Sequence, residues 1–207
     1  GVESMSQVTM PSAFQPGAPL GPQYGPLELE RYDGRLMAQG PSSELMNDRF
    51  GLSREELDAY SVRSHKRALA ATRAGAFVKQ MVPITADPQD PNGPCITADE
   101  GIREHLDTEK MASLKTVFAK NGRTTAANAS QVSDGAAALL VADRGYAERT
   151  GLKPRARFRA MSVAGADPVI QFTAILEATH KALKIAGLSA ADIDLYEVNE
   201  AFAGVPL

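Results

Sequence analysis

The chain has 207 residues, of which 43% are hydrophobic and 23% charged. These values are typical of globular proteins and allow one or two domains with a buried core. A net charge of −3 at pH 7 argues against a general affinity for nucleic acid or for anionic membranes. The single cysteine excludes an internal disulfide and disfavours a thiolate zinc site.

The chain shows no signal for export or membrane insertion. Its first residues lack the basic and apolar regions of a signal peptide. The longest apolar run, residues 136–142, is too short to span a bilayer. We therefore expect a cytoplasmic or organelle-matrix location, which in a eukaryote would be the mitochondrion or the peroxisome.

Residues 7–40 are expected to be irregular, because closely spaced prolines and glycines interrupt every helical or strand period. Composition leaves open whether this stretch is functional or a disordered linker. Regular structure is expected to begin near Pro41, in a short helix that Ser42 or Ser43 caps and Gly51 ends.

The best helix-start signal lies between residues 52 and 57. Ser53 and Glu56 have the spacing of a capping box, and Leu52 and Leu57 occupy hydrophobic-staple positions. This helix should extend to about Ala74. One face is predicted to collect apolar and small residues, and the opposite face to expose basic ones. The first set is Leu57, Tyr60, Ser61, Ser64, Ala68 and Ala71, and the second is Arg54, Lys66 and Arg67.

A strand at residues 77–82 and an exposed loop at 86–94 should follow. Residues 99–132 are polar and irregular, with small helical pieces such as 109–114. The remaining chain then alternates between strand and helix patterns, which predicts an α/β fold. The expected strands are 136–141, 155–160 and 193–198, and the expected helices end at Gly151 and span 172–186 before Gly187.

Several reactive residues make weak candidates for chemistry. Cys95 follows Asn-Gly-Pro, with no neighbouring group to lower its pKa, so it is interpreted as an inert loop thiol. The histidines at 65, 105 and 180 share no metal-ligand spacing. Acidic residues near positions 87–100 are better explained as a solvated loop than as a cation site. We therefore predict no metal site.

Asn199 is the strongest candidate, because it directly follows the last expected strand. Open α/β folds place chemistry at such strand ends, and a neutral amide can hold a water or an oxygen anion. A simple strand-end cap is the more ordinary explanation of this residue taken alone.

Four separated segments resemble the thiolases, a family of acyl-CoA acyltransferases, in the expected order and spacing. They are Gly-Val-Glu-Ser-Met-Ser at 1–6, Asp-Glu-Gly-Ile-Arg at 99–103, Thr-Ala-Ala-Asn-Ala-Ser at 125–130 with Asp-Gly-Ala-Ala at 134–137, and Asn-Glu-Ala-Phe at 199–202. The resemblance covers nearly the whole chain. It implies an incomplete, layered α/β thiolase fold with a large irregular loop domain.

The resemblance also assigns roles at the reacting end of the substrate. Asn199 matches an asparagine that holds a catalytic water against the thioester oxygen, as part of an oxyanion hole. Phe118 and Phe202 match apolar walls of the pantetheine tunnel, although phenylalanine is more often plain core.

Further along the substrate, the resemblance implies contacts with coenzyme A. Arg103 matches a residue at the nucleotide end, where a guanidinium suits phosphate and can stack on adenine. The alternative for Arg103 is a surface ion pair with Glu100 or Glu104. Ala126 and Ser130 match small residues along the pantetheine arm, and their alternative is a tightly packed turn.

The chain also departs from the thiolase pattern. Ala127 and Ser133 stand where Gly and Asn are common, and Ala38-Gln39 replaces a His-Met pair of some biosynthetic members. That replacement favours a degradative 3-ketoacyl-CoA thiolase of fatty acid β-oxidation. The nucleophilic cysteine, the histidine of a Gly-His-Pro loop and the cysteine of a Cys-x-Gly loop have no counterpart in these 207 residues.

The resemblance therefore implies an internal fragment of an acetyl-CoA C-acyltransferase that is inactive by itself. Residues 1–131 would form the loop domain over coenzyme A, with an oligomerisation segment at about 7–40. Residues 132–153 would return to the N-terminal domain, and 154–207 would begin the C-terminal domain. CoA and acyl-CoA would be substrates, no cofactor would be bound covalently, and the complete protein would be a homo-oligomer. The alternative is a non-catalytic CoA-binding module or a pseudoenzyme subunit.

Overall fold

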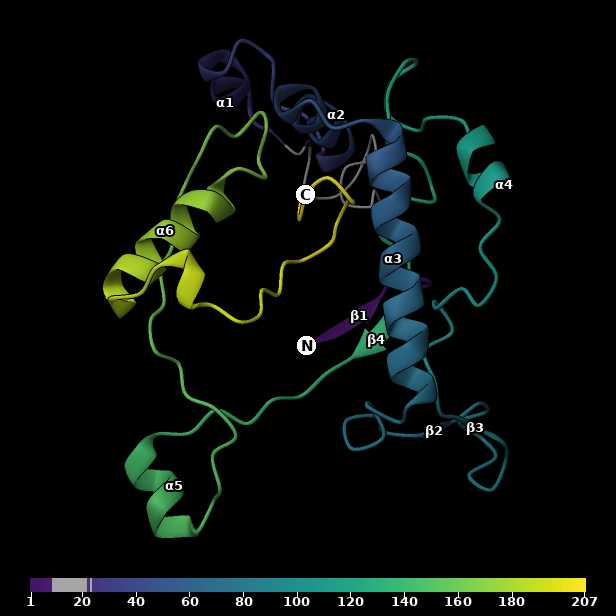
Figure 1. The fold of residues 1–207 in the computed structure, drawn as a ribbon, viewed down its shortest axis with the longest axis vertical. Coiled ribbons are helices and arrows are strands. Elements are labelled where there is room, and N and C mark those ends of the chain that lie inside the picture. The colour runs from purple at the N-terminus through teal and green to yellow at the C-terminus, as the bar shows by residue number, and fades with distance from the viewer. Residues whose placement is uncertain (9–21, 23) are drawn as a thin grey trace. The chain divides into compact units, whose positions relative to one another are not determined.

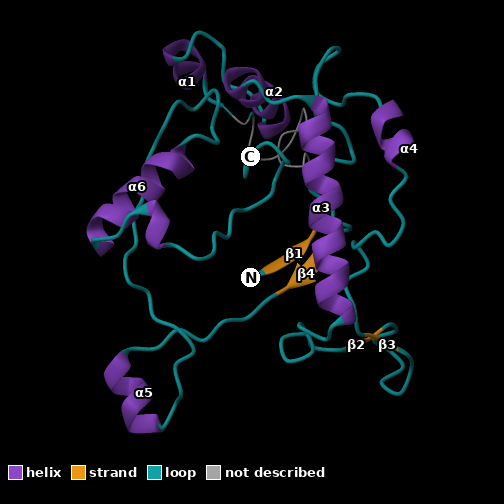
Figure 2. Cartoon of the chain, in the orientation of Figure 1, coloured by secondary structure: helices purple, strands orange, loops and turns teal. Residues whose placement is uncertain are grey.

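The computed structural model describes residues 1–8, 22 and 24–207. Figures 1 and 2 show helices joined by long loops, with little strand. The helices are α1 (Pro26–Arg31), α2 (Gln39–Phe50), α3 (Arg54–Arg73), α4 (Thr108–Ser113), α5 (Arg144–Thr150) and α6 (Ala174–Ala186), with a 3₁₀ turn at Ala190–Asp192. The strands are β1 (Val2–Ser4), β2 (Ile84–Thr85), β3 (Cys95–Ile96) and β4 (Asp134–Ala136).

The chain divides into two compact units. Unit 1 contains Gly1–Ser42 and Val132–Val198, and unit 2 contains Ser43–Gln131 and Asn199–Leu207. In unit 1, β1 and β4 pair antiparallel, with Glu3 opposite Gly135. In unit 2, β2 and β3 form a short antiparallel hairpin around the exposed loop predicted at 86–94.

Helix α3 confirms the helix predicted from its start signal. The Ser53 amide donates to the Glu56 carboxylate at 2.8 Å, and the Glu56 amide donates to the Ser53 hydroxyl at 3.2 Å. Two of the free amides of the first turn are thereby satisfied. Leu57 is only 1% exposed and anchors the helix to the core of unit 2.

The prediction that Arg54 faces water is wrong, although Lys66 and Arg67 are exposed as expected. Only 18% of the Arg54 side chain is exposed. Its guanidinium pairs with Asp58 at 2.7 Å and donates to the Met111 carbonyl at 2.6 Å. A guanidinium has enough donors to cap the end of α4 while it keeps its ion pair within α3.

The start of α2 also differs from prediction. The helix begins at Gln39, so that Ser42 and Ser43 lie inside it, fully buried, and do not cap it. Pro41 is compatible with this start, because the first helical turn needs no amide donor. Helix α1 occupies part of the stretch predicted to be irregular. Residues 9–21 and 23 of that stretch lie outside the described residues.

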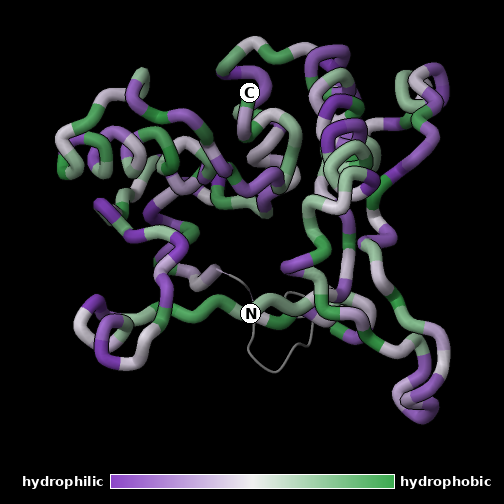
Figure 3. Tube along the Cα trace, turned by 60° about the horizontal axis from the view of Figure 1, so that its bottom comes forward, coloured by the Kyte–Doolittle hydropathy of each residue, from purple (hydrophilic) through white to green (hydrophobic). Residues whose placement is uncertain are grey.

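The strands predicted at 77–82, 136–141, 155–160 and 193–198 are wrong. Residues 74–80 form turns, and β4 ends at Ala136. Leu139 is 83% exposed and Leu195 is 89% exposed. A buried strand needs ladder partners and covered faces, and β1 is the only partner of β4 among the described residues. Figure 3 shows hydrophobic residues along extended stretches as well as on helices.

Helices of the second half agree with prediction at their ends. Gly151 closes α5 with φ of 69°, and Gly187 closes α6 with φ of 67°. The left-handed region is one that glycine enters without steric cost. Within the described part of the chain, none of the helices has the length and apolar character needed to cross a membrane.

Candidate functional site

The Asn-Glu-Ala-Phe segment lies against the turn that contains Ser130, within unit 2. The Ser130 amide donates to the Ala201 carbonyl at 3.0 Å, and the Ala203 amide donates to the Asn128 carbonyl at 2.9 Å. Ala129 and Phe202 form an antiparallel bridge between these bonds. Two segments some seventy positions apart in the sequence are thus joined by backbone hydrogen bonds.

Two aromatic rings stand beside this junction. Phe202 is 9% exposed, and Phe118 is 38% exposed. Their ring centroids are 5.8 Å apart at an interplanar angle of 89°, the edge-to-face arrangement that aromatic pairs favour. The pair forms a rigid apolar surface that is partly open to solvent.

Asn128 holds the preceding turn in place from inside. Its Oδ1 accepts from the Thr125 amide at 2.8 Å, and its Nδ2 donates to the Arg123 carbonyl at 3.0 Å and to Asp58 at 2.8 Å. The side chain is buried with its donors and its acceptor in use, as buried amides require. Ala126, at the outside of the turn, remains exposed.

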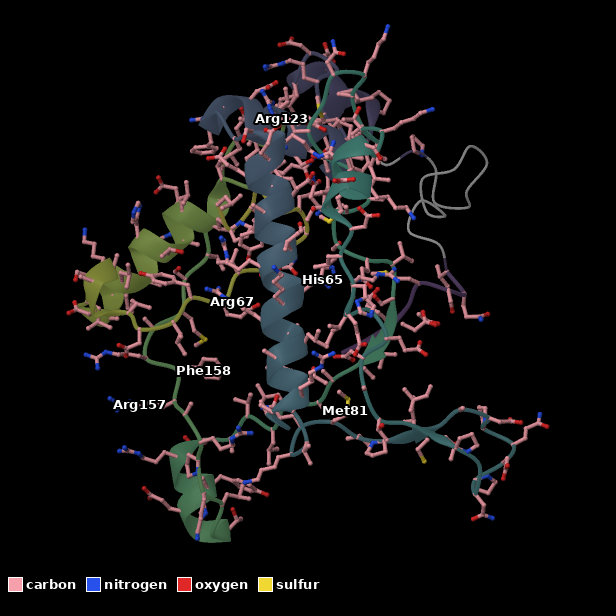
Figure 4. The ribbon with its side chains drawn as sticks, turned by 45° about the vertical axis from the view of Figure 1, so that its right-hand side comes forward. His65, Arg67, Met81, Arg123, Arg157 and Phe158 are labelled. Atoms are coloured by element: carbon pink, nitrogen blue, oxygen red, sulfur yellow. The ribbon has the colours of Figure 1, made fainter. Side chains whose placement is uncertain are left out.

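Glu44 of α2 fixes the start of the same turn. Its carboxylate accepts from the Arg123 amide at 2.8 Å and from the Thr124 amide at 2.8 Å. The residue is only 6% exposed, and successive backbone amides offset the cost of burying its charge. The Arg123 side chain pairs with Asp48 at 2.5 Å. Figure 4 shows Arg123 near the N-terminal end of α3.

Glu200 connects the Asn-Glu-Ala-Phe segment to α3. The Tyr60 hydroxyl donates to one carboxylate oxygen at 2.5 Å, and the Ser64 hydroxyl donates to the other at 3.1 Å. Burial, followed by the hydrogen bond and charge of Glu200, raises the pKa of Tyr60 to about 12. Sequence reasoning placed Tyr60 and Ser64 on the packed face of the helix and missed this contact. In the sequence, the indication of such a contact is the pair of hydroxyl side chains spaced four residues apart on one helix.

Arg103 is held by a contact of its backbone with α3. Its amide donates to His65 Nδ1 at 3.2 Å, which requires this nitrogen of the imidazole to be unprotonated. Burial, with a smaller contribution from the Arg103 charge, lowers the pKa of His65. His65 lies midway along α3 (Figure 4). The nearby Gly101 carbonyl accepts from Gln131 at 2.5 Å, which connects the 99–103 segment to the end of the 125–131 turn.

The ion pair considered for Arg103 does not form among the described residues. Glu104 instead pairs with Arg73 at 3.4 Å, with both side chains largely exposed. A pocket of about 400 Å³ lies beside Arg103. It is lined by Lys66, Leu69, Arg103, Glu104, His105, Leu106 and Asp107. Lys66 and Arg103 contribute cations to this pocket, Glu104 and Asp107 contribute carboxylates, and the two leucines offer apolar contact.

Two protein-family models match the chain. Residues 1–145 match the thiolase N-terminal domain, and residues 152–207 match the thiolase C-terminal domain. The chain belongs to the thiolase family. The family resemblance expected from the four motifs is therefore confirmed.

Relatives and a solved structure agree with this membership. A steroid 3-ketoacyl-CoA thiolase of Mycobacterium tuberculosis is 43% identical over 99% of this chain, and the human peroxisomal 3-ketoacyl-CoA thiolase is 41% identical over 86%. The acetyl-CoA acetyltransferase of Bacillus anthracis has 35% identity and a TM-score of 0.82 over the full chain. The α/β thiolase fold class is thereby confirmed.

The matched region is only part of each relative. The chain spans about half the length of the relatives it matches: 50% of the mycobacterial protein, 43% of the human protein and 53% of the solved structure. The fold is accordingly incomplete relative to whole thiolases.

Within this thiolase frame, all six predicted site residues belong to unit 2. Ser130, Phe202 and Phe118 meet at one junction, with Ala126 on the same turn. Arg103 is linked to that turn through Gly101 and Gln131. Asn199 is exposed at the head of its segment, after an extended stretch that forms no strand. Their roles in the thiolase site remain predictions.

Cys95 is exposed and lies in strand β3, which forms no part of the junction between residues 128–130 and 201–203. Among the residues that the structure describes, no group of three or more His, Cys, Asp or Glu side chains is arranged to hold a metal ion.

Proposed function

We propose that this chain contributes the CoA-covering part and the oxyanion-hole asparagine of a thiolase that cleaves 3-ketoacyl-CoA with CoA, or runs the reverse Claisen condensation. The pairing of residues 201–203 with residues 128–130 carries this proposal. Asn199 lies two residues before the first paired residue, Ala201, and we propose that the pairing holds it near the pantetheine arm. Fatty acid β-oxidation is the proposed setting, since several relatives are named 3-ketoacyl-CoA thiolases.

In the proposed reaction, the Asn199 amide holds a water that donates a hydrogen bond to the thioester oxygen. Negative charge develops on that oxygen when the carbon–carbon bond breaks and an enolate forms. A neutral donor placed there beforehand stabilises the enolate without reorganising. Phe118 and Phe202 exclude solvent around the pantetheine arm, Ala126 and Ser130 let it lie close to the backbone, and Arg103 binds its nucleotide end.

The 207 residues are proposed to bind CoA but not to turn it over. The family's first step needs a cysteine nucleophile activated by a histidine. The one cysteine here is Cys95, exposed on a hairpin, with no histidine contact among the described residues. In a thiolysis assay with acetoacetyl-CoA and CoA, we expect no enzyme-dependent loss of substrate. Sustained cleavage proportional to the protein concentration would overturn this statement.

The second candidate is a CoA-binding module or pseudoenzyme subunit that never takes part in catalysis. All five residues proposed to contact CoA lie in one unit, which favours a binding function that is separable from catalysis. The two candidates differ at Asn199. Adding polypeptide that carries the family's two cysteines and histidine would produce activity only if this chain supplies a working Asn199, and Asn199→Ala should then abolish it.

Calorimetry with CoA tests the nucleotide contact. Arg103→Ala should weaken CoA binding by about tenfold to a hundredfold, because a charge-assisted hydrogen bond contributes about 1.5–3 kcal/mol. Arg49→Ala, at an exposed arginine of α2, is the matched control and should leave the affinity unchanged. Equal affinities for wild type and Arg103→Ala would remove Arg103 from the proposed site.

The domain division at residues 131 and 153, homo-oligomerisation through about 7–40, and a cytoplasmic or organelle-matrix location remain proposals. The peroxisomal names of plant and human relatives support an organelle matrix for a eukaryotic member. Sedimentation of the chain with and without residues 7–40 would test the oligomerisation segment.

A further inference from the structure

Two hydroxyl groups of α3 hold a single carboxylate. Tyr60 and Ser64 are four residues apart, so they lie on the same face of the helix, one turn apart. Each donates to a different oxygen of Glu200, at 2.5 Å and 3.1 Å. Because both carboxylate oxygens are held, the plane of the group is fixed as well as its position.

The carboxylate is held by these neutral hydroxyls and not by a cation. Among the described residues, no Lys, Arg or His pairs with Glu200. Arg63, on the same helix, lies over the Tyr60 ring, with its guanidinium carbon 5.0 Å from the ring centroid. That arrangement keeps the ring in place while its hydroxyl points to Glu200. A phenol whose pKa is raised to about 12 stays protonated, and therefore stays a donor, throughout the physiological range.

The segment is fixed on its other side by backbone contacts. The Ala201 carbonyl accepts from Ser130, and the Ala203 amide donates to Asn128. Residue 200 is thus held through its side chain, and residues 201–203 through their backbone. The residue immediately before this doubly held segment is Asn199.

We propose that Tyr60 and Ser64 are positioning residues that act through Glu200 to orient Asn199. This inference rests on the proposed function, in which Asn199 holds the water at the thioester oxygen. A hydrogen-bond donor must lie within a fraction of an ångström of its place to stabilise a developing charge. The backbone pairs downstream set the position of the segment, and the two hydroxyls set its rotation at the residue next to Asn199.

Isotope-labelled full chain allows a test that needs no activity. Nitrogen relaxation gives an order parameter for the Asn199 backbone and for its side-chain amide. In Tyr60→Phe/Ser64→Ala we expect the Asn199 backbone value to fall from about 0.85 to below about 0.6, the range of flexible chain. Ser64→Thr keeps a hydroxyl and should retain the wild-type value. Tyr196→Phe, which removes a hydroxyl bonded to Ala190 in unit 1, is the matched control and should change nothing at Asn199.

Amide-exchange protection of Ser130 and Ala203 shows that each variant is folded around the junction. If both amides stay protected and Asn199 stays as rigid as in wild type, the positioning role is wrong. If the double variant loses this protection, Glu200→Ala decides, since it leaves α3 intact and removes the acceptor of both hydroxyls. Mobile Asn199 in Glu200→Ala supports the proposal, and rigid Asn199 overturns it.

Binding of CoA and of acetoacetyl-CoA separates this inference from the proposed function. A wild type that binds neither ligand contradicts the proposed function, whatever the order parameters show. If both ligands bind, the double variant should bind CoA as wild type does, and should lose about threefold to tenfold affinity for acetoacetyl-CoA. This is the loss expected for one misplaced hydrogen bond. Equal losses for both ligands would overturn the specific role at Asn199.

Discussion

At the scale of single residues, the chain uses buried polar side chains to shape loops that lack regular structure. Glu44 and Asn128 together bind amides and carbonyls of residues 123–125. Both are buried, and both would be costly without partners. The turn that carries Ala126 and Ser130 therefore depends on hydrogen bonds more than on apolar packing.

Gly122 tests this dependence on Glu44. A Cβ at position 122 would overlap the Glu44 carboxylate, closer than van der Waals contact allows, and would displace it from the Arg123 and Thr124 amides. We expect Gly122→Ala to lower the free energy of unfolding of unit 2 by about 2 kcal/mol, because buried donors lose their acceptor. Urea unfolding measures the change. Gly135→Ala, where a Cβ meets nothing within 4 Å, is the control and should cost less than about 0.5 kcal/mol.

His65 should make stability depend on pH. Its pKa in the folded protein is lowered from 6.5, mainly by burial, so the unfolded chain binds a proton more readily than the folded one. The contribution of His65 is therefore fully present above about pH 6.5 and is lost as the pH falls below that value. Protonation of Nδ1 would also remove the acceptor for the Arg103 amide.

The measurement compares unfolding free energies of wild type and His65→Asn between pH 7.5 and pH 5, at about half-unit steps. Wild type should lose more stability than the variant below pH 6.5. Parallel curves would show that His65 titrates alike in both states. His180→Asn, at an exposed histidine of α6, serves as the control and should follow wild type.

At the scale of elements, α3 organises unit 2. It carries the capping box at its start, the Asp58 contact with Asn128, the hydroxyls that hold Glu200, and the imidazole that holds Arg103. Both ends of the proposed substrate site are thereby attached to one straight element. A helix suits this use because its residue spacing is rigid.

The capping box should matter for this helix in particular. Ser53→Ala removes the acceptor for the Glu56 amide and should cost about 1 kcal/mol of stability. Ser53→Thr keeps the acceptor and should cost much less. Thermal unfolding followed by far-ultraviolet circular dichroism measures both, and an equal loss in the two variants would contradict the capping role.

At the scale of the whole molecule, the chain exposes apolar segments that its sequence pattern marks for burial. Leu139 and Leu140 of unit 1 are 83% and 77% exposed, and no apolar residue of α6 is buried. Unpaired extended segments with apolar side chains are templates for association.

We therefore expect the chain to self-associate and to bind a hydrophobic dye. Leu139→Glu/Leu140→Glu should reduce both, because charge opposes edge pairing. Analytical ultracentrifugation over a range of concentrations is the measurement. Lys153→Gln/Arg155→Gln, at exposed basic positions, is the control, because it makes the net charge more negative by the same two units. A monomer with a cooperative melt and little dye binding would contradict this expectation.

The amino-acid sequence by itself determined the features that depend on near neighbours. Contacts within a few residues determine the capping box at Ser53, which begins α3. They also determine the glycine ends of α5 at Gly151 and of α6 at Gly187. The thiolase motifs could be recognised in the sequence for the same reason, since each is a short contiguous run of residues. Family membership followed from their order along the chain.

Only the tertiary structure decided the features that need distant partners. The extended pattern of residues 136–141 gave no strand, because a ladder requires a neighbour that local sequence does not specify. Arg54 turned inward because the end of α4 offered carbonyls more than fifty residues away. The contact of Tyr60 and Ser64 with Glu200 spans about 140 positions, and no local period encodes a hydrogen bond across that separation.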